Sequence, residues 1–178
     1  MTFSSAFGKP PAMIAGDRAR RLLVFLCCLW LTGTAAAAGR IGLAAPDFTL
    51  KDLDGQPHAL AQMRRHGHVL LIFWATECVY CHALLPEFKN AQARYGGHGL
   101  TVAAINIGGE HREEVAAYVK DYRVNYVTLA ERAHNLDVAQ AYGVIGTPTI
   151  VLVSPAGTIL YYGHKLPRLE RWLGRPAA

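Results

Sequence analysis

Residues 69–81, with the sequence VLLIFWATECVYC, decide the fold of this chain. The first seven are apolar without interruption, which is typical of a β-strand that is buried on both faces of a sheet. After Cys81, apolar residues recur at helical spacing, at positions 84, 85, 88, 91 and 95. The pattern therefore predicts a buried strand that leads through a Cys-x-x-Cys pair into a helix.

Cys78 and Cys81 fall where this helix is expected to begin, and that position favours thiol chemistry. The first N–H groups of a helix have no partner inside the helix and its dipole is positive there, so a thiolate is stabilised. The thiolate attacks disulfides, and a second thiol one turn later can displace whatever the first has bonded. The pair predicts thiol–disulfide exchange, with Cys78 as the accessible thiol and Cys81 as the resolving thiol.

The first 38 residues are expected to lie outside the folded domain. Three arginines between positions 18 and 21 precede an apolar run, and small residues follow it. This order is typical of a cleaved secretory signal peptide. An uncleaved membrane anchor is the alternative, because the 17 residues 22–38 are just long enough to span a bilayer. In both cases residues 39–178 form a domain in the periplasm or another extracytoplasmic compartment.

The cysteines beyond this leader number only two, because Cys27 and Cys28 lie within its apolar run. An exported domain with one closely spaced pair has no disulfide framework, and a bridge over so short a loop would restrict the unfolded chain little. We therefore expect the pair to be chemically active. Of the formal charge of +5, the leader supplies +3, so the remainder has no nucleic-acid-binding footprint.

The rest of the pattern predicts one α/β domain whose sheet is covered by helices on both faces. Residues 45–60 predict an N-terminal β-hairpin that turns at Asp54-Gly55. Further strands are expected at 69–75, 100–107, 126–129, 149–153 and 158–162, and helices at 81–95, 110–122, 136–142 and 169–173.

Four features in this order resemble the thioredoxin superfamily, and most closely its exported TlpA/ResA/DsbE-like branch of thiol–disulfide oxidoreductases. They are the FWATxCxxC segment 73–81, Pro86 in the following helix, the GTPT turn 146–149 and the N-terminal hairpin. The likeness runs from about residue 41 to the end. It implies a thioredoxin-like fold, with a central mixed β-sheet flanked by helices and an N-terminal β-hairpin extension.

The resemblance implies roles for five residues. Cys78 and Cys81 fall on the redox pair, and Trp74 falls on the aromatic residue that packs under the active site. Pro148 falls on the cis-proline that faces the disulfide, and Thr147 on the residue whose backbone pairs with an extended substrate. Such main-chain pairing selects little for sequence.

The partners that the resemblance implies are proteins with disulfides and a membrane thiol reductant such as a DsbD/CcdA-like protein, which restores the dithiol. We expect a monomer without a cofactor, metal site or nucleic-acid partner. The expected direction is reduction, in the manner of reductases that serve cytochrome c maturation, and an oxidase or isomerase is the alternative.

Three departures from the family pattern concern protons and electron flow. Ile72 stands where related proteins have a buried Asp or Asn, Glu77 where Trp is common, and Leu84 where some reductases have an acidic residue. The usual buried proton acceptor is therefore missing. Glu77 or His82 is a candidate to handle protons in its place.

Cys78, Cys81 and His82 also form the string CxxCH, which attaches c-type haem. An electron-transfer cytochrome with His82 as axial ligand, or a copper-binding chaperone, is therefore an alternative function. Haem needs an accommodating pocket, whereas an apolar strand runs directly into this pair. Adjacent residues of a helix point about 100° apart, which disfavours Cys81 and His82 as ligands of one metal. Peroxidase chemistry of the peroxiredoxin kind lacks the Thr three residues before Cys78.

Overall fold

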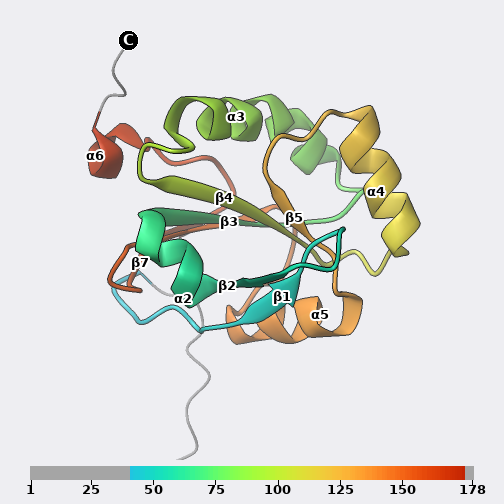
Figure 1. Cartoon of the computed structure of the whole chain (residues 1–178), viewed down its shortest axis with the longest axis horizontal. Helices are drawn as coiled ribbons and strands as arrows, with labels where there is room; N and C mark the ends of the chain where they lie inside the picture. The colour runs from blue at the N-terminus through green and yellow to red at the C-terminus, as the bar shows by residue number, and fades with distance from the viewer. Residues whose placement is uncertain (1–40, 175–178) are drawn as a thin grey trace, which may run out of the picture. The chain divides into compact units, whose positions relative to one another are not determined.

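The structure, a computed structural model, describes residues 41–174, so the predicted leader 1–38 lies outside the described residues. These residues form a five-stranded sheet in the order β5-β4-β3-β6-β7 (Figure 1). The strands are β3 (His68–Trp74), β4 (Leu100–Asn106), β5 (Val127–Leu129), β6 (Thr149–Val153) and β7 (Ile159–Gly163). The first three are parallel, whereas β6 is antiparallel to β3 and β7 is antiparallel to β6. The predicted α/β fold with a central mixed sheet is confirmed.

Helices cover both faces of this sheet (Figure 1). One face carries α3 (Val79–Tyr95), α4 (Arg112–Asp121) and the short C-terminal α6 (Glu170–Leu173), and the other carries α5 (Arg132–Ala141) and the short α2 (Leu60–Met63). Within the described range, no helix combines the length and the apolar character that crossing a membrane requires.

The central strand β3 organises two hydrophobic clusters. Because side chains alternate along a strand, positions 69, 71 and 73 join the cluster on the α5 side, and positions 70, 72 and 74 join the cluster on the α3 side. All residues from 69 to 74 are at most 5% exposed. The uninterrupted apolar run is therefore explained by burial on both faces.

The predicted N-terminal hairpin is present as β1 (Thr49–Lys51) and β2 (Pro57–Ala59). Asp52 Oδ1 accepts hydrogen bonds from the backbone N–H groups of Asp54 and Gln56, which holds the turn. The backbone of Lys51 also accepts a bond from Ala130, just after β5. Residues 42–45 pair with the start of β7, so the N-terminal segment covers both edges of the sheet.

The structure differs most clearly from the sequence-based prediction in helices α5 and α2. Helix α5 begins at Arg132, four residues before the predicted start at 136, because the turn 132–135 contains no apolar periodicity. Asn135 of this helix is fully buried because its side chain is hydrogen-bonded there: Nδ2 donates to the carbonyls of Asn106 and Leu129. Helix α2 was not predicted, because a single turn is too short to show a period.

Replacing Asn135 by Ala should lower the free energy of unfolding by about 2–4 kcal/mol, because two buried carbonyls lose their donor. Urea unfolding followed by circular dichroism measures the change. Gln140→Ala on the exposed face of the same helix is the control and should change stability by less than about 0.5 kcal/mol. Equal effects of the two substitutions would contradict this account.

Candidate functional site

Cys78 and Cys81 are joined in a disulfide at the start of α3, with an S–S distance of 2.09 Å and a Cα–Cα distance of 5.2 Å. Cys78 is the N-cap residue, and its sulfur accepts a hydrogen bond from the backbone N–H of Cys81 at 3.1 Å. Cys78 is half-buried, whereas Cys81 is only 4% exposed. This asymmetry suits an outer attacking sulfur and an inner resolving sulfur, and those two roles stay a prediction.

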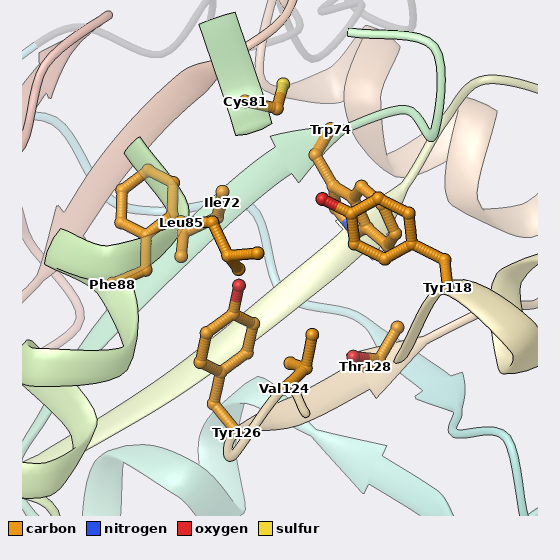
Figure 2. Close-up of a pocket in the computed structure, with 9 residues that line it drawn as sticks. All are labelled: Ile72, Trp74, Cys81, Leu85, Phe88, Tyr118, Val124, Tyr126 and Thr128. Atoms are coloured by element: carbon orange, nitrogen blue, oxygen red, sulfur yellow. The ribbon is translucent and has the colours of Figure 1, made fainter. Parts of the chain in front are cut away.

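Trp74 ends β3 and lines a small pocket beneath Cys81 (Figure 2). The Trp74 ring packs against the ring of Tyr118, with 4.7 Å between centroids. The structure thus places the predicted aromatic residue beside the inner cysteine. Ile72, at the position where the resemblance implies a buried Asp or Asn, also lines this pocket, and no carboxylate does.

The Thr147–Pro148 peptide bond is cis, and the structure brings it close to the start of α3. Pro148 is buried, and its carbonyl accepts a hydrogen bond of 2.7 Å from Nδ1 of His164. A groove of about 380 Å³ separates this turn from α3. It is lined by Tyr80, Ala83, Leu84, Thr147, Pro148, His164 and Lys165.

Large apolar side chains are exposed between the two cysteines and in the loop before the cis-proline turn. Val79 and Tyr80, between the cysteines, are 77% and 75% exposed, and Ile145, in that loop, is 96% exposed. Exposed apolar side chains that lie together often mark a surface for binding another molecule. Val79 and Tyr80 therefore give the disulfide an exposed apolar border.

His82 and Glu77, the two residues predicted to handle protons, occupy different environments. His82 Nε2 donates to the carbonyl of Thr76 at 2.8 Å, since a carbonyl can only accept. Its ring meets Tyr118 and Tyr122 edge-on, with 5.0 Å between centroids in each case. Glu77 is exposed. Among the hydrogen bonds of residues 41–174, neither side chain bonds a cysteine sulfur, so the proton role of both stays a prediction.

Glu110 is a site residue that the sequence analysis missed. It follows β4, and its Oε1 accepts hydrogen bonds from the backbone N–H and the hydroxyl of Thr76, the latter at 2.7 Å. Gly108 permits this arrangement, because a Cβ there would lie 2.2 Å from Glu110 Oε2. Glu110 therefore holds the turn that leads from β3 into the cysteine pair.

The charge of Glu110 follows from these contacts. Burial raises its pKa, but the hydrogen bonds that Thr76 donates outweigh burial, so the pKa lies below its usual value. Parallel pairing of β3 and β4 was the signal that could have revealed this residue, since it brings the loops after both strands together.

Replacing Glu110 by Gln should lower the free energy of unfolding at pH 7 by about 1–2 kcal/mol, since hydrogen bonds to a charged acceptor are stronger than those to an amide. Because the pKa of Glu110 is lower in the folded than in the unfolded protein, its ionised carboxylate stabilises the folded state at pH values above the ordinary pKa of 4.5. This stabilisation disappears as the pH falls through the folded-state pKa. Urea unfolding at several pH values tests the difference. Glu87→Gln, at an exposed position of α3, is the control. A difference that does not depend on pH would refute the assignment.

The haem and metal alternatives both require sulfurs that face a ligand. The sulfurs are bonded to each other here, and Cys81 is packed against Trp74 and Phe88. In the part of the chain that the structure describes, no three His, Cys, Asp or Glu side chains are grouped so that they could hold a metal ion. A bonded pair of sulfurs at a helix N-terminus is the geometry that disulfide exchange uses.

Comparison with known proteins agrees with this geometry. Residues 41–162 match the model of the AhpC/TSA family. The thiol-disulfide oxidoreductase ResA of Geobacillus thermodenitrificans is 32% identical over 126 residues, which cover 71% of this chain and 70% of that protein. The thioredoxin-like protein YneN of Bacillus subtilis is 32% identical over 121 residues, 66% of this chain and 68% of that protein.

Two solved structures show the same fold. A thiol:disulfide interchange protein from a Bacteroides species superimposes with a TM-score of 0.69 at 22% identity, over 76% of this chain and 91% of that one. The thioredoxin domain of a thiol-disulfide oxidoreductase from Bacteroides vulgatus superimposes with a TM-score of 0.65 at 23% identity, over 71% of this chain and 90% of that one. The chain belongs to the AhpC/TSA family, among its thioredoxin-like thiol–disulfide oxidoreductases.

Proposed function

We propose that this protein exchanges disulfides with exported proteins through Cys78 and Cys81, and that it acts as their reductase. The observation that carries the proposal is the pairing of a half-buried and a buried sulfur at a helix N-terminus, beside a groove that ends at the Thr147–Pro148 turn. Only the outer sulfur can meet a macromolecular disulfide, and only the inner sulfur is protected from a second partner.

The exchange runs in two displacements. In the reduced protein, the Cys78 thiolate attacks a substrate disulfide, forms a mixed disulfide and releases one substrate sulfur. Cys81 then loses its proton and attacks the Cys78 sulfur, and the second substrate sulfur leaves and takes up a proton. Two electrons pass to the substrate, and the protein ends with the Cys78–Cys81 bond seen here.

The backbone supports the first displacement. As the N-cap of α3, Cys78 has its sulfur within 3.1 Å of the backbone N of Cys81, in front of the N–H groups of the first turn. These donors stabilise negative charge on the Cys78 sulfur. Glu77 is adjacent but exposed, so water screens its repulsion.

The groove beside the disulfide suits an extended segment of the substrate. Thr147 lines the groove and would pair with such a segment through its backbone, while Tyr80, Leu84 and Pro148 would offer apolar contacts for its side chains. Lys165 is the charged side chain at the rim of this groove, and no acidic side chain lines it. The groove therefore favours substrates that carry an acidic residue close to their reactive cysteine.

Export and the electron source complete the proposal. Residues 1–38 act as a signal peptide or an anchor, and a membrane thiol reductant of the DsbD/CcdA type returns Cys78 and Cys81 to the dithiol. Without that supply an oxidising compartment would keep the pair bonded. Apocytochromes c, whose cysteines must be reduced before haem attachment, are substrates of the required kind.

Cys81→Ser should accumulate a mixed disulfide at Cys78 when the reduced protein meets a substrate protein, because the resolving thiol is gone. Cys78→Ser should trap less than about a tenth as much, since Cys81 is 4% exposed. Intact-mass spectrometry after acid quenching counts the adducts. Cys27 and Cys28 are replaced by Ser in both variants, so that only the pair can react. Equal trapping by the two variants would contradict the assigned roles.

Lys165→Glu should lower the rate of exchange with a peptide that carries Asp beside its cystine by up to about fivefold, because a rim charge contributes up to about 1 kcal/mol. The rate with the matching Lys peptide should rise. Stopped-flow fluorescence with the two peptides measures both rates. Arg132→Glu, at the start of α5 on the opposite face of the sheet, is the control (Figure 1). An unchanged ratio of the rates would exclude Lys165 as a determinant.

A further inference from the structure

Thr76 lies in the turn that leads from β3 into the cysteine pair, and its backbone N–H, backbone carbonyl and hydroxyl are all bonded by side chains of other elements. The turn itself is closed by a hydrogen bond of 3.2 Å from the backbone N–H of Cys78 to the carbonyl of Ala75. Glu110 accepts from the N–H and the hydroxyl of Thr76, and His82 donates to its carbonyl at 2.8 Å. Thr76 is therefore held both by the loop after β4 and by helix α3.

The imidazole ring of His82 is fixed where this bond requires it. His82 belongs to the first turn of α3, and its backbone N–H donates to the carbonyl of Cys78 at 3.1 Å. Its half-buried side chain meets the rings of Tyr118 and Tyr122, which come from α4 and its C-terminal end. Tyr118 packs in turn against Trp74 (Figure 2). A ring that neighbours already hold loses little side-chain entropy when it binds a carbonyl.

The bond between His82 and Thr76 connects the turn to helix α3 independently of the disulfide. In the oxidised protein the disulfide itself keeps the Cys78 sulfur at the start of the helix, 3.1 Å from the backbone N of Cys81. Reduction removes this covalent link, so the Cys78 sulfur then stays in front of the helix N–H groups only while the turn keeps its place. Those N–H groups stabilise the thiolate that the first displacement requires.

We propose that His82 is a positioning residue: through Thr76 it keeps the reduced Cys78 sulfur at the start of α3, and this raises the reduction potential of the pair. The inference rests on the proposed function, because the reduced form is the one that attacks a substrate disulfide. A contact that matters more in the dithiol than in the disulfide stabilises the dithiol, and a more stable dithiol means a higher potential. This role requires no proton transfer by His82.

The test compares His82→Ala and His82→Gln in the full chain, with Cys27 and Cys28 replaced by Ser so that only the pair can react. Gln carries an amide N–H about as far from the backbone as Nε2 of His, so it restores the donor, whereas Ala does not. Each protein is equilibrated in graded glutathione buffers, in which two glutathione thiols reduce the pair and become one glutathione disulfide. Acid quenching and intact-mass spectrometry then give the ratio of dithiol to disulfide.

We expect His82→Ala to lower this ratio about three- to tenfold in a given buffer, because the reduced form loses the hydrogen bond and the placement of its thiolate. This change corresponds to a potential about 15–30 mV more negative. His82→Gln should give a ratio closer to that of the wild-type chain than His82→Ala does. His98→Ala, at an exposed position beyond the end of α3, is the matched control and should leave the ratio unchanged.

Urea unfolding of the oxidised and the reduced forms separates positioning from a merely structural role. If His82 only stabilised the fold, His82→Ala would destabilise both forms equally and the potential would not move. The proposal requires that the reduced form loses more stability than the oxidised form. Equal losses, a ratio that is unchanged or raised, or equal shifts in the Ala and Gln variants would overturn it. If the wild-type chain shows no reversible change of two thiols in these buffers, the proposed function itself fails, which is a distinguishable result.

Discussion

The pairing of strand β3 with both of its neighbours is the constraint on which the site depends. Its parallel register with β4 places Trp74 opposite Asn106, and its antiparallel register with β6 places Phe73 opposite Thr149. The end of β3, the end of β4 and the start of β6 therefore meet at one edge of the sheet. The cysteine pair follows the first, Glu110 follows the second, and Pro148 precedes the third. A shift of β3 by one residue would turn each of its side chains to the opposite face and would dismantle this edge.

The same register explains why the two sulfurs differ. β3 is buried on both faces up to Trp74, so the chain emerges from the core only at the turn that Glu110 holds. Helix α3 then starts at the surface and packs back across the sheet through Phe88, Ala91 and Tyr95. The first cysteine therefore remains near solvent, while the second is carried under the helix. The sheet thus decides which of the two sulfurs a partner can reach, and the proposed order of the two displacements depends on this difference.

The sequence was most informative where burial or chemistry leaves a local pattern. The apolar run 69–75 located the central strand, and its order and spacing with the CxxC pair and the GTPT turn 146–149 together indicated the candidate site. Glu110 was missed because its role depends on a contact between residues 34 positions apart, which no local pattern records. Asn135 was missed for the same reason: its partners lie on β4 and at the end of β5. Polar contacts between loops become predictable only once the strand order is known.

Ile72 stands where the family resemblance predicts a buried Asp or Asn, and this difference changes the surroundings of the inner cysteine. A carboxylate beside a thiol couples to it, so the two titrate together and neither has a pKa of its own. The polar groups that line this pocket are hydroxyl and indole groups, and no carboxylate lines it. A negative charge on the inner sulfur would therefore meet no repulsion from a carboxylate of the pocket, and burial of the sulfur is what disfavours that charge.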